Sequence, residues 1–141
     1  MPVCTFFGHR DCPSSIKPKL REVLIDLIEK QSVDMFYVGN KGSFDRLVRS
    51  VLRELAQEYP QINYTVVLER MPGKQNEEDF SDTMLPEGIE EVPPRFAIVW
   101  RNKWMLRQSD FVLTYIAHSW GGAAQFAEMA KRQKKNVINL A

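Results

Sequence analysis

The sequence predicts an α/β protein with a three-layer, Rossmann-like fold: a five-stranded, mainly parallel sheet in the order 3-2-1-4-5, with helices on both faces. Apolar runs of strand length alternate along the chain with amphipathic segments of helical length, which is the pattern of successive βαβ units. The strand candidates are almost continuously apolar, as expected for strands that are buried on both faces of a sheet. With 141 residues and no visible repeat or linker, we expect a single domain spanning residues 1–141.

The N-terminal third of the chain predicts one βαβ unit. Val3–Phe7 is a continuous apolar run and is the first predicted strand. The Ser14-Ser15 pair offers an N-cap to a helix over Ile16–Lys30, whose apolar residues recur at helical spacing on one face. Asp34–Val38 contains two aromatic residues and a valine and is the second predicted strand.

The middle of the chain continues the alternation and then departs from it. A helix is predicted over Phe44–Glu58 from its apolar stripe, and Tyr59-Pro60 ends it. Asn63–Leu68 is the third predicted strand. The acidic, proline-containing segment Glu69–Pro94 is interpreted as a solvated loop. Because it is longer than loops in compact domains usually are, a lid over the site is the second interpretation.

The C-terminal third predicts the last two strands and two further helices. A helix is predicted over Arg95–Gln108 and a strand over Asp110–Ile116, which is rich in β-branched and aromatic residues. A second helix over Gly122–Lys134 carries alanine, phenylalanine and methionine at helical spacing, with basic residues at its end. Asn136–Leu140 is the fifth predicted strand.

Composition and charge narrow the class of protein. The formal net charge is +1, which argues against a duplex nucleic acid or an anionic membrane surface as a partner. No apolar run approaches the ~18 residues of a membrane-spanning helix, and the N-terminus lacks the basic region of a signal peptide. The two cysteines are expected to be reduced thiols in a cytoplasmic protein. Cys12 and His9 lack further ligands, so no metal or cofactor is predicted.

Three polar, glycine-bearing loops follow predicted strands. In the predicted strand order, the first and fourth strands lie side by side at the topological switch point, where ligands of such sheets bind beyond the strand C-termini. Glycines before a helix let backbone N–H groups approach a ligand, and the helix start favours a phosphate. We therefore expect a ligand site formed by Gly8, His9, Arg10, Gly39, Asn40, Gly42, Ser43, His118, Ser119, Trp120, Gly121 and Gly122.

Several of these residues have a second interpretation. Arg10 could bind a phosphate bidentately or pair with Asp11 on the surface, and His9 could donate to a ligand or be structural. Ser43 could belong to a second anion cradle or simply cap the following helix. Trp120 could stack on a base, and His118 could act as an acid or base.

Five motifs along the chain carry a resemblance to a known family: Phe7-Gly8-His9-Arg10, Tyr37 to Asp45, Asp82-Thr83-Met84-Leu85-Pro86, Arg101 to Met105 and Ser119 to Ala123. They resemble the YpsA-like proteins of the SLOG superfamily, a Rossmann-like group that includes the lonely-guy phosphoribohydrolases and the DNA-processing protein DprA. The resemblance spans essentially the whole chain. It implies a nucleotide or nucleotide-derived ligand in the crevice.

The resemblance also implies two catalytic positions. Arg101 and Glu128 fall where the lonely-guy enzymes carry the arginine and glutamate that act in hydrolysis of the N-glycosidic bond of a nucleoside monophosphate. Asn102, Trp120 and the Ala124-Gln125 pair depart from that pattern. We therefore favour binding or sensing of a phosphorylated nucleotide or nucleotide sugar over hydrolysis, with nucleic-acid binding as in DprA as the third hypothesis. The apolar helix with Phe96, Trp100 and Trp104 further suggests a homodimer.

Overall fold

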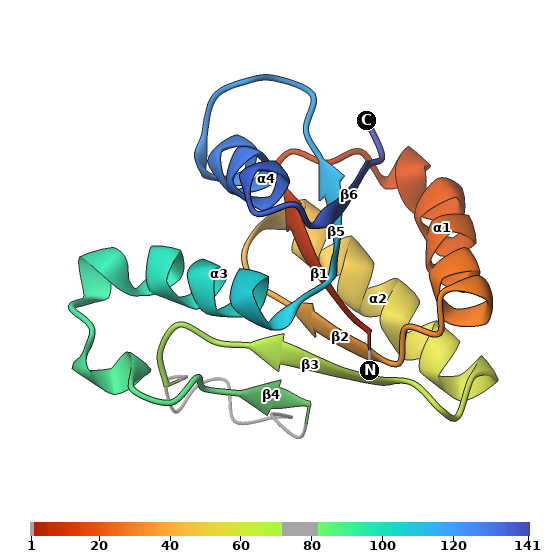
Figure 1. The fold of residues 1–141 in the computed structure, drawn as a ribbon, viewed down its shortest axis with the longest axis horizontal. Coiled ribbons are helices and arrows are strands. Elements are labelled where there is room, and N and C mark those ends of the chain that lie inside the picture. Colours follow the sequence, from red (N-terminus) through yellow and green to blue (C-terminus); the bar gives the residue numbers. More distant parts are fainter. Residues whose placement is uncertain (1, 72–81) are drawn as a thin grey trace.

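The structure is a computed structural model that describes residues 2–71 and 82–141. Six parallel strands form one sheet in the order β4-β3-β2-β1-β5-β6 (Figure 1). The strands are β1 (Val3–Gly8), β2 (Met35–Val38), β3 (Asn63–Val67), β4 (Thr83–Met84), β5 (Phe111–Tyr115) and β6 (Asn136–Asn139). The helices are α1 (Lys17–Lys30), α2 (Gly42–Glu58), α3 (Ala97–Gln108) and α4 (Gly122–Arg132).

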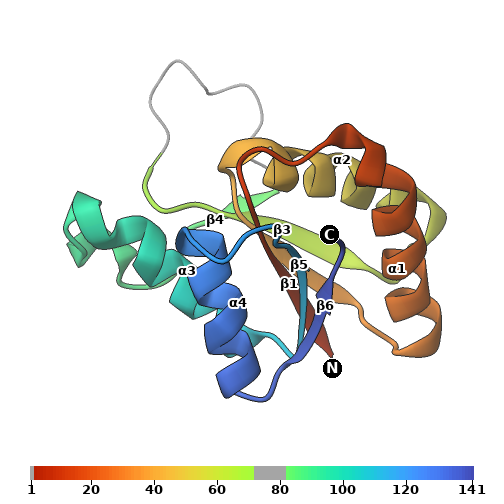
Figure 2. The same ribbon diagram turned by 90° about the horizontal axis from the view of Figure 1, so that it is seen from above.

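Both faces of the sheet are covered, which explains the continuous apolar strands. Figure 2 shows α1 and α2 on one side of the sheet and α3 and α4 on the other. Neighbouring residues of a strand point to opposite faces. Phe6 accordingly belongs to the core under α1 and α2, whereas Phe7 belongs to the core under α3 and α4. The same division separates Val66 from Val67.

The prediction of five strands is wrong by one, although the predicted α/β class and the order of the five strands are confirmed. The sixth strand, β4, adds to the edge of the sheet by pairing Thr83 with Val66 and Met84 with Val67. It lies in the acidic segment that we interpreted as a loop. Among its described residues, that segment also contains the short 3-10 turn Ile89–Glu91, and a second turn, Pro94–Phe96, begins at its last residue and replaces the start of the predicted helix. Residues 72–81, on which the lid interpretation partly falls, lie outside the described residues.

The start of the first helix also differs from the prediction. Ser14 and Ser15 form a 3-10 turn with Ile16, and α1 begins after it without a side-chain cap. The backbone N–H of Ile16 donates to the carbonyl of Pro13 at 3.3 Å, so the turn itself supplies a partner that a serine cap would have supplied.

Among the helices of the described residues, none combines the length and the apolar character of a membrane-spanning helix.

Candidate functional site at the strand C-termini

An open cavity of about 520 Å³ lies beyond the C-terminal ends of β1 and β5. It is bounded by α3 and by the first turns of α2 and α4. Eight of the predicted site residues line it: Gly8, His9, Arg10, Arg101, His118, Trp120, Gly121 and Gly122. The structure therefore brings the loop after β1 and the glycine loop before α4 to one cavity, as expected for a switch point between parallel strands.

The glycine loop leaves the start of α4 open to the cavity. Gly121 has a φ of 98°, a conformation that residues with a side chain rarely adopt. No atom lies within 4 Å of the position that a Cβ on Gly122 would take. The N–H groups in the first turn of a helix have no intrahelical partner and carry partial positive charge. This end of α4 can therefore receive an anionic group from the cavity.

Three rings form a stack that ends at the surface. The rings of His9 and His118 are 3.6 Å apart between centroids, and those of His118 and Trp120 are 3.7 Å apart, each pair close to parallel. The backbone N–H of His118 donates to Nε2 of His9 at 3.4 Å. Burial, and secondarily the neighbouring His118, lowers the pKa of His9, which favours the neutral ring that accepts this bond. Trp120 is 69% exposed, so its outer face is free for a planar ligand group.

Ser43 joins α2 to the loop after β1 and does not cap its helix. The residue before α2 is Lys41, and it makes no side-chain capping bond. The Ser43 hydroxyl donates to the carbonyl of Arg10 and accepts the backbone N–H of Cys12 at 2.7 Å. A Cβ on Gly42, whose φ is 86°, would lie 3.0 Å from the Cα of Arg10. Gly42 and Ser43 thus hold the Arg10 loop beside the cavity, and their role in a second anion cradle stays a prediction.

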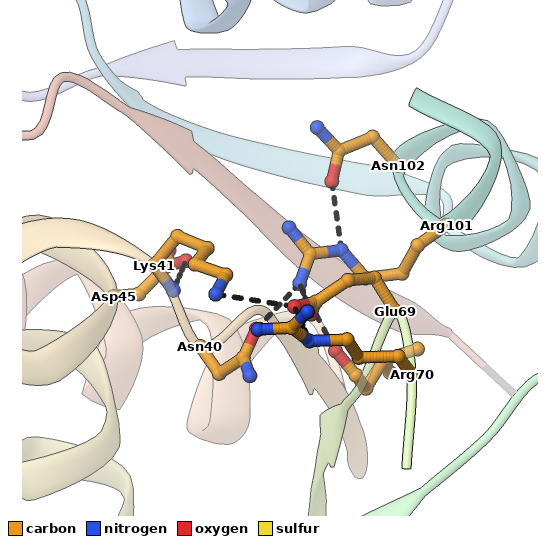
Figure 3. A network of polar contacts seen from close by, with 8 residues as sticks. Asn40, Lys41, Asp45, Glu69, Arg70, Arg101 and Asn102 are labelled. Atoms are coloured by element: carbon orange, nitrogen blue, oxygen red, sulfur yellow. Dashed lines mark hydrogen bonds and ion pairs between the residues drawn. The ribbon is translucent and has the colours of Figure 1, made fainter. Parts of the chain in front are cut away.

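Arg101 lies at the floor of the cavity with only 2% of its surface exposed (Figure 3). Its Nη1 donates to Oδ1 of Asn40 at 2.8 Å and to the carbonyl of Val67 at 3.2 Å. Its Nε donates to Oδ1 of Asn102 at 3.1 Å. Burial lowers the pKa of the guanidinium, and the carboxyls of Asp45 and Glu69 oppose that effect. Arg101 is therefore a fixed cation of the floor.

Two carboxyls surround this arginine and a neighbouring lysine. Oε1 of Glu69 lies 3.1 Å from Nζ of Lys41, and Oε2 lies 3.5 Å from Nη1 of Arg101. Burial alone would raise the pKa of Glu69, but hydrogen bonds from its own backbone and from Lys41, together with both cations, lower it. Glu69 is therefore ionised.

Asp45 is the second carboxyl, and it is held more deeply. Its Oδ2 accepts the backbone N–H of Lys41 at 3.1 Å. Burial raises the pKa of Asp45 to about 6, against the opposing effects of that bond and of Arg101 and Arg49. A Cβ on Gly39 would lie 2.7 Å from Oδ2 of Asp45, so Gly39 gives this carboxyl the room it occupies.

Glu128 and Ser119 do not lie in this cavity. They line a separate cleft of about 200 Å³ between α4 and the ends of β5 and β6. Oε1 of Glu128 is 3.5 Å from Nζ of Lys131, and both side chains are mostly exposed. Arg101 and Glu128, the two positions that the family resemblance marks as catalytic, therefore line different clefts.

The sequence predicted only part of the cluster of charged residues at the floor of the cavity, which consists of Lys41, Asp45, Glu69 and Arg101. We interpreted the Glu69 segment as a loop and did not place Lys41 at the site. Glu69 follows β3 almost directly, just as His9 follows β1, so its position after a strand was an available signal. Its partners Lys41 and Arg101, however, come from another loop and from α3, and nothing local in the sequence marks those two pairings.

Comparisons with known proteins find the same fold in DNA processing proteins. DNA processing protein A (DprA) from Streptococcus pneumoniae aligns with 99% of this chain at a TM-score of 0.71 and 16% identity. DNA processing protein A from Helicobacter pylori, described for its single-stranded DNA binding mode, aligns with 98% at a TM-score of 0.69 and 13% identity. The likeness is one of fold. The chain spans 50% of the first protein and 64% of the second. No protein-family model and no curated protein matches the sequence.

These neighbours correct one expectation and support another. The near-neutral net charge led us to argue against nucleic acid as a partner and to rank nucleic-acid binding third, and a fold neighbour described for its single-stranded DNA binding mode contradicts that expectation. Net charge averages over the whole surface, whereas a strand is held by local donors and stacking rings. The Rossmann-like fold is shared with DprA, as the resemblance implied, while membership of the SLOG superfamily and the closer YpsA-like resemblance stay predictions.

Proposed function

We propose that this protein binds single-stranded nucleic acid and that the cavity receives one nucleotide unit of the strand. The observation that carries the proposal is the ring stack that ends in the exposed face of Trp120, next to the open start of α4. A base stacks on the indole, and the adjoining phosphate meets the N–H groups at Gly122 and Ala123. Two DNA processing proteins with this fold support nucleic acid as the class of ligand.

A free phosphorylated nucleotide or nucleotide sugar is the second candidate ligand. The cavity volume of about 520 Å³ lies within the usual range of small-molecule sites, which favours this alternative. The same stack and the same helix start would hold the base and the phosphate. The two candidates therefore differ in the length of the ligand and not in the residues that bind it.

Hydrolysis of the N-glycosidic bond is the less favoured activity. A carboxylate that stabilises an oxocarbenium-like centre must lie within reach of the bound sugar. Glu128 instead lines the separate cleft and pairs with Lys131. We therefore propose a binding role and assign no reaction to Arg101 or Glu128.

Fluorescence anisotropy with labelled oligo-dT of about 16 nucleotides tests the proposal, since this length covers the site of about 4–16 nucleotides that a single OB-fold domain occupies. Trp120→Ala should weaken binding by about 5- to 150-fold, the factor equivalent to losing about 1–3 kcal/mol of base stacking. Gly122→Val places a side chain in open space at the start of α4 and should weaken binding comparably without disturbing the fold. Met71→Ala is the matched control, because Met71 is about as exposed as Trp120 and does not line the cavity.

Two outcomes would contradict the proposal in different ways. Tight binding of a mononucleotide with no measurable oligo-dT binding would establish the second candidate in its place. Oligo-dT binding that neither Trp120→Ala nor Gly122→Val weakens would move the nucleic-acid site to another surface.

A further inference from the structure

The charged side chains at the cavity balance one another. Within the described residues, the lining contains the cations Arg10, Lys41 and Arg101 and the carboxyls Asp11 and Asp45. The carboxylate of Glu69 stands against two of these cations, at 3.1 Å from Lys41 and 3.5 Å from Arg101. With all six groups ionised and histidines counted as neutral, their formal charges cancel.

The floor cations are therefore already partly neutralised before any ligand arrives. Arg101 is 2% exposed, Glu69 is 6% exposed and Asp45 is 9% exposed, so their mutual interactions are poorly screened by water. What remains to attract an anion is the positive end of α4, equivalent to about half an elementary charge, and Arg10, an exposed side chain whose charge water screens. The start of α2 adds little, because the N–H of Lys41 donates to Asp45 and that of Ser43 donates to Arg10.

We propose that the cavity binds a singly charged phosphodiester in preference to a phosphomonoester dianion, and that Asp45 and Glu69 are the residues that set this preference. The inference rests on the proposed nucleotide-binding function and deepens it by naming the phosphate chemistry. A phosphodiester is the linkage of a nucleic-acid strand, whereas a free nucleoside monophosphate carries a phosphomonoester.

The physical reason is the balance of desolvation against attraction. The first negative charge loses its water and gains the start of α4. A second charge loses further hydration, and it meets the buried carboxylates of Asp45 and Glu69, while Arg101, the buried cation of the lining, already interacts with both of them. The cavity thus has room for the phosphate but no unpaired buried charge to match the dianion.

The charges of Asp45 and of a phosphomonoester depend on the pH. Burial raises the pKa of Asp45 to about 6, so Asp45 is ionised at about pH 8. A phosphomonoester, whose second pKa is about 6, is then a dianion, while a phosphodiester keeps one charge at any pH in this range. Measurements at about pH 8 therefore compare one ligand charge with two against the same balanced cavity.

Calorimetric titration with thymidine 5′-monophosphate and with its methyl ester tests the proposal. The two ligands share base and sugar and differ in one charge. We expect the wild-type protein to bind the methyl ester about tenfold more tightly, equivalent to about 1.4 kcal/mol. Asp45→Asn and Glu69→Gln each remove one negative charge while keeping the side-chain shape. Both should strengthen binding of the monophosphate more than that of the ester, and so reduce the ratio. Asp26→Asn, an exposed carboxylate on α1, is the control and should leave the ratio unchanged.

Three results would each contradict a different claim: the phosphate preference, its assignment to Asp45 and Glu69, or the proposed function itself. Binding of the monophosphate as tightly as the ester, or more tightly, by the wild-type protein would overturn this inference and leave nucleotide binding intact. An unchanged ratio in both Asp45→Asn and Glu69→Gln would overturn the assignment to these carboxyls. Binding of neither thymidine ligand, together with no binding of oligo-dT, would overturn the proposed function and the inference with it.

Discussion

Asp45→Asn is expected to stabilise the folded protein at neutral and alkaline pH. Asp45 is 9% exposed, and burial raises its pKa from 3.8 to about 6. Because the pKa is higher in the folded state, the folded protein holds the proton more tightly than the unfolded chain. The stability that Asp45 contributes is fully present below about pH 4 and is lost as the pH rises through about 6. At 1.36 kcal/mol per unit of pKa, the loss is about 3 kcal/mol.

Asparagine has no charge to desolvate, so the variant keeps the stability of the protonated wild type at every pH. Its amide oxygen can still accept the backbone N–H of Lys41. Relative to the wild type, we expect Asp45→Asn to raise the free energy of unfolding by up to about 3 kcal/mol at about pH 8 and by well under 1 kcal/mol at about pH 4.

Urea unfolding of both proteins at about pH 4, 6 and 8 measures this difference. Subtracting the free energy of unfolding of the wild type from that of the variant at each pH cancels the contributions of groups that titrate in both proteins, such as His9. A difference that is the same at all three pH values would show that Asp45 does not titrate in this window. A variant that is less stable at about pH 8 would show that attraction to Arg101 outweighs the desolvation of the carboxylate, and would refute the reasoning.

Three further variants test other parts of the structure. Gly8→Ala should destabilise the fold by about 1–3 kcal/mol in urea unfolding, because its Cβ would overlap the ring of Phe44; a neutral effect would contradict this packing. Glu128→Gln should change oligo-dT affinity by less than about twofold, since the exposed pair with Lys131 lies outside the cavity; a large loss would bring Glu128 back into the site. Phe96 is 51% exposed, and Phe96→Glu should convert a self-associating protein to a monomer in analytical ultracentrifugation; a monomeric wild type would contradict the expected homodimer.

Most of the sheet could be predicted because burial on both faces leaves a strong sequence signal. Phe6 and Phe7 are neighbours in β1 and pack into different cores, so the strand is apolar at every position. β4 gives no such signal. It has two residues, Thr83 and Met84, which are too few to show a period, and it lies in a segment dominated by charge and proline. Its pairing with β3 depends on tertiary contacts.

The candidate site could likewise be predicted only in part from the sequence. Loops that follow neighbouring parallel strands must meet at one edge of the sheet, so strand order alone predicts that Gly8 and Gly122 approach the same cavity. The stacking order of His9, His118 and Trp120 depends on the path of the loop between β5 and α4. A glycine loop has too many accessible conformations for composition to fix that path.

The error about nucleic acid came from treating charge as a property of the whole chain. A net charge of +1 gives no sign of the strongly basic surface that long-range attraction to a duplex requires, but it does not show how the charges are distributed. A site for one nucleotide unit requires much less. It needs a ring to stack on and a few N–H groups for a phosphate, and backbone N–H groups at a helix start add nothing to the formal charge. In this cavity the side-chain charges cancel in the same way as those of the chain. A near-neutral net charge is therefore compatible with a site that binds its ligand by stacking on Trp120 and by phosphate binding at the start of α4.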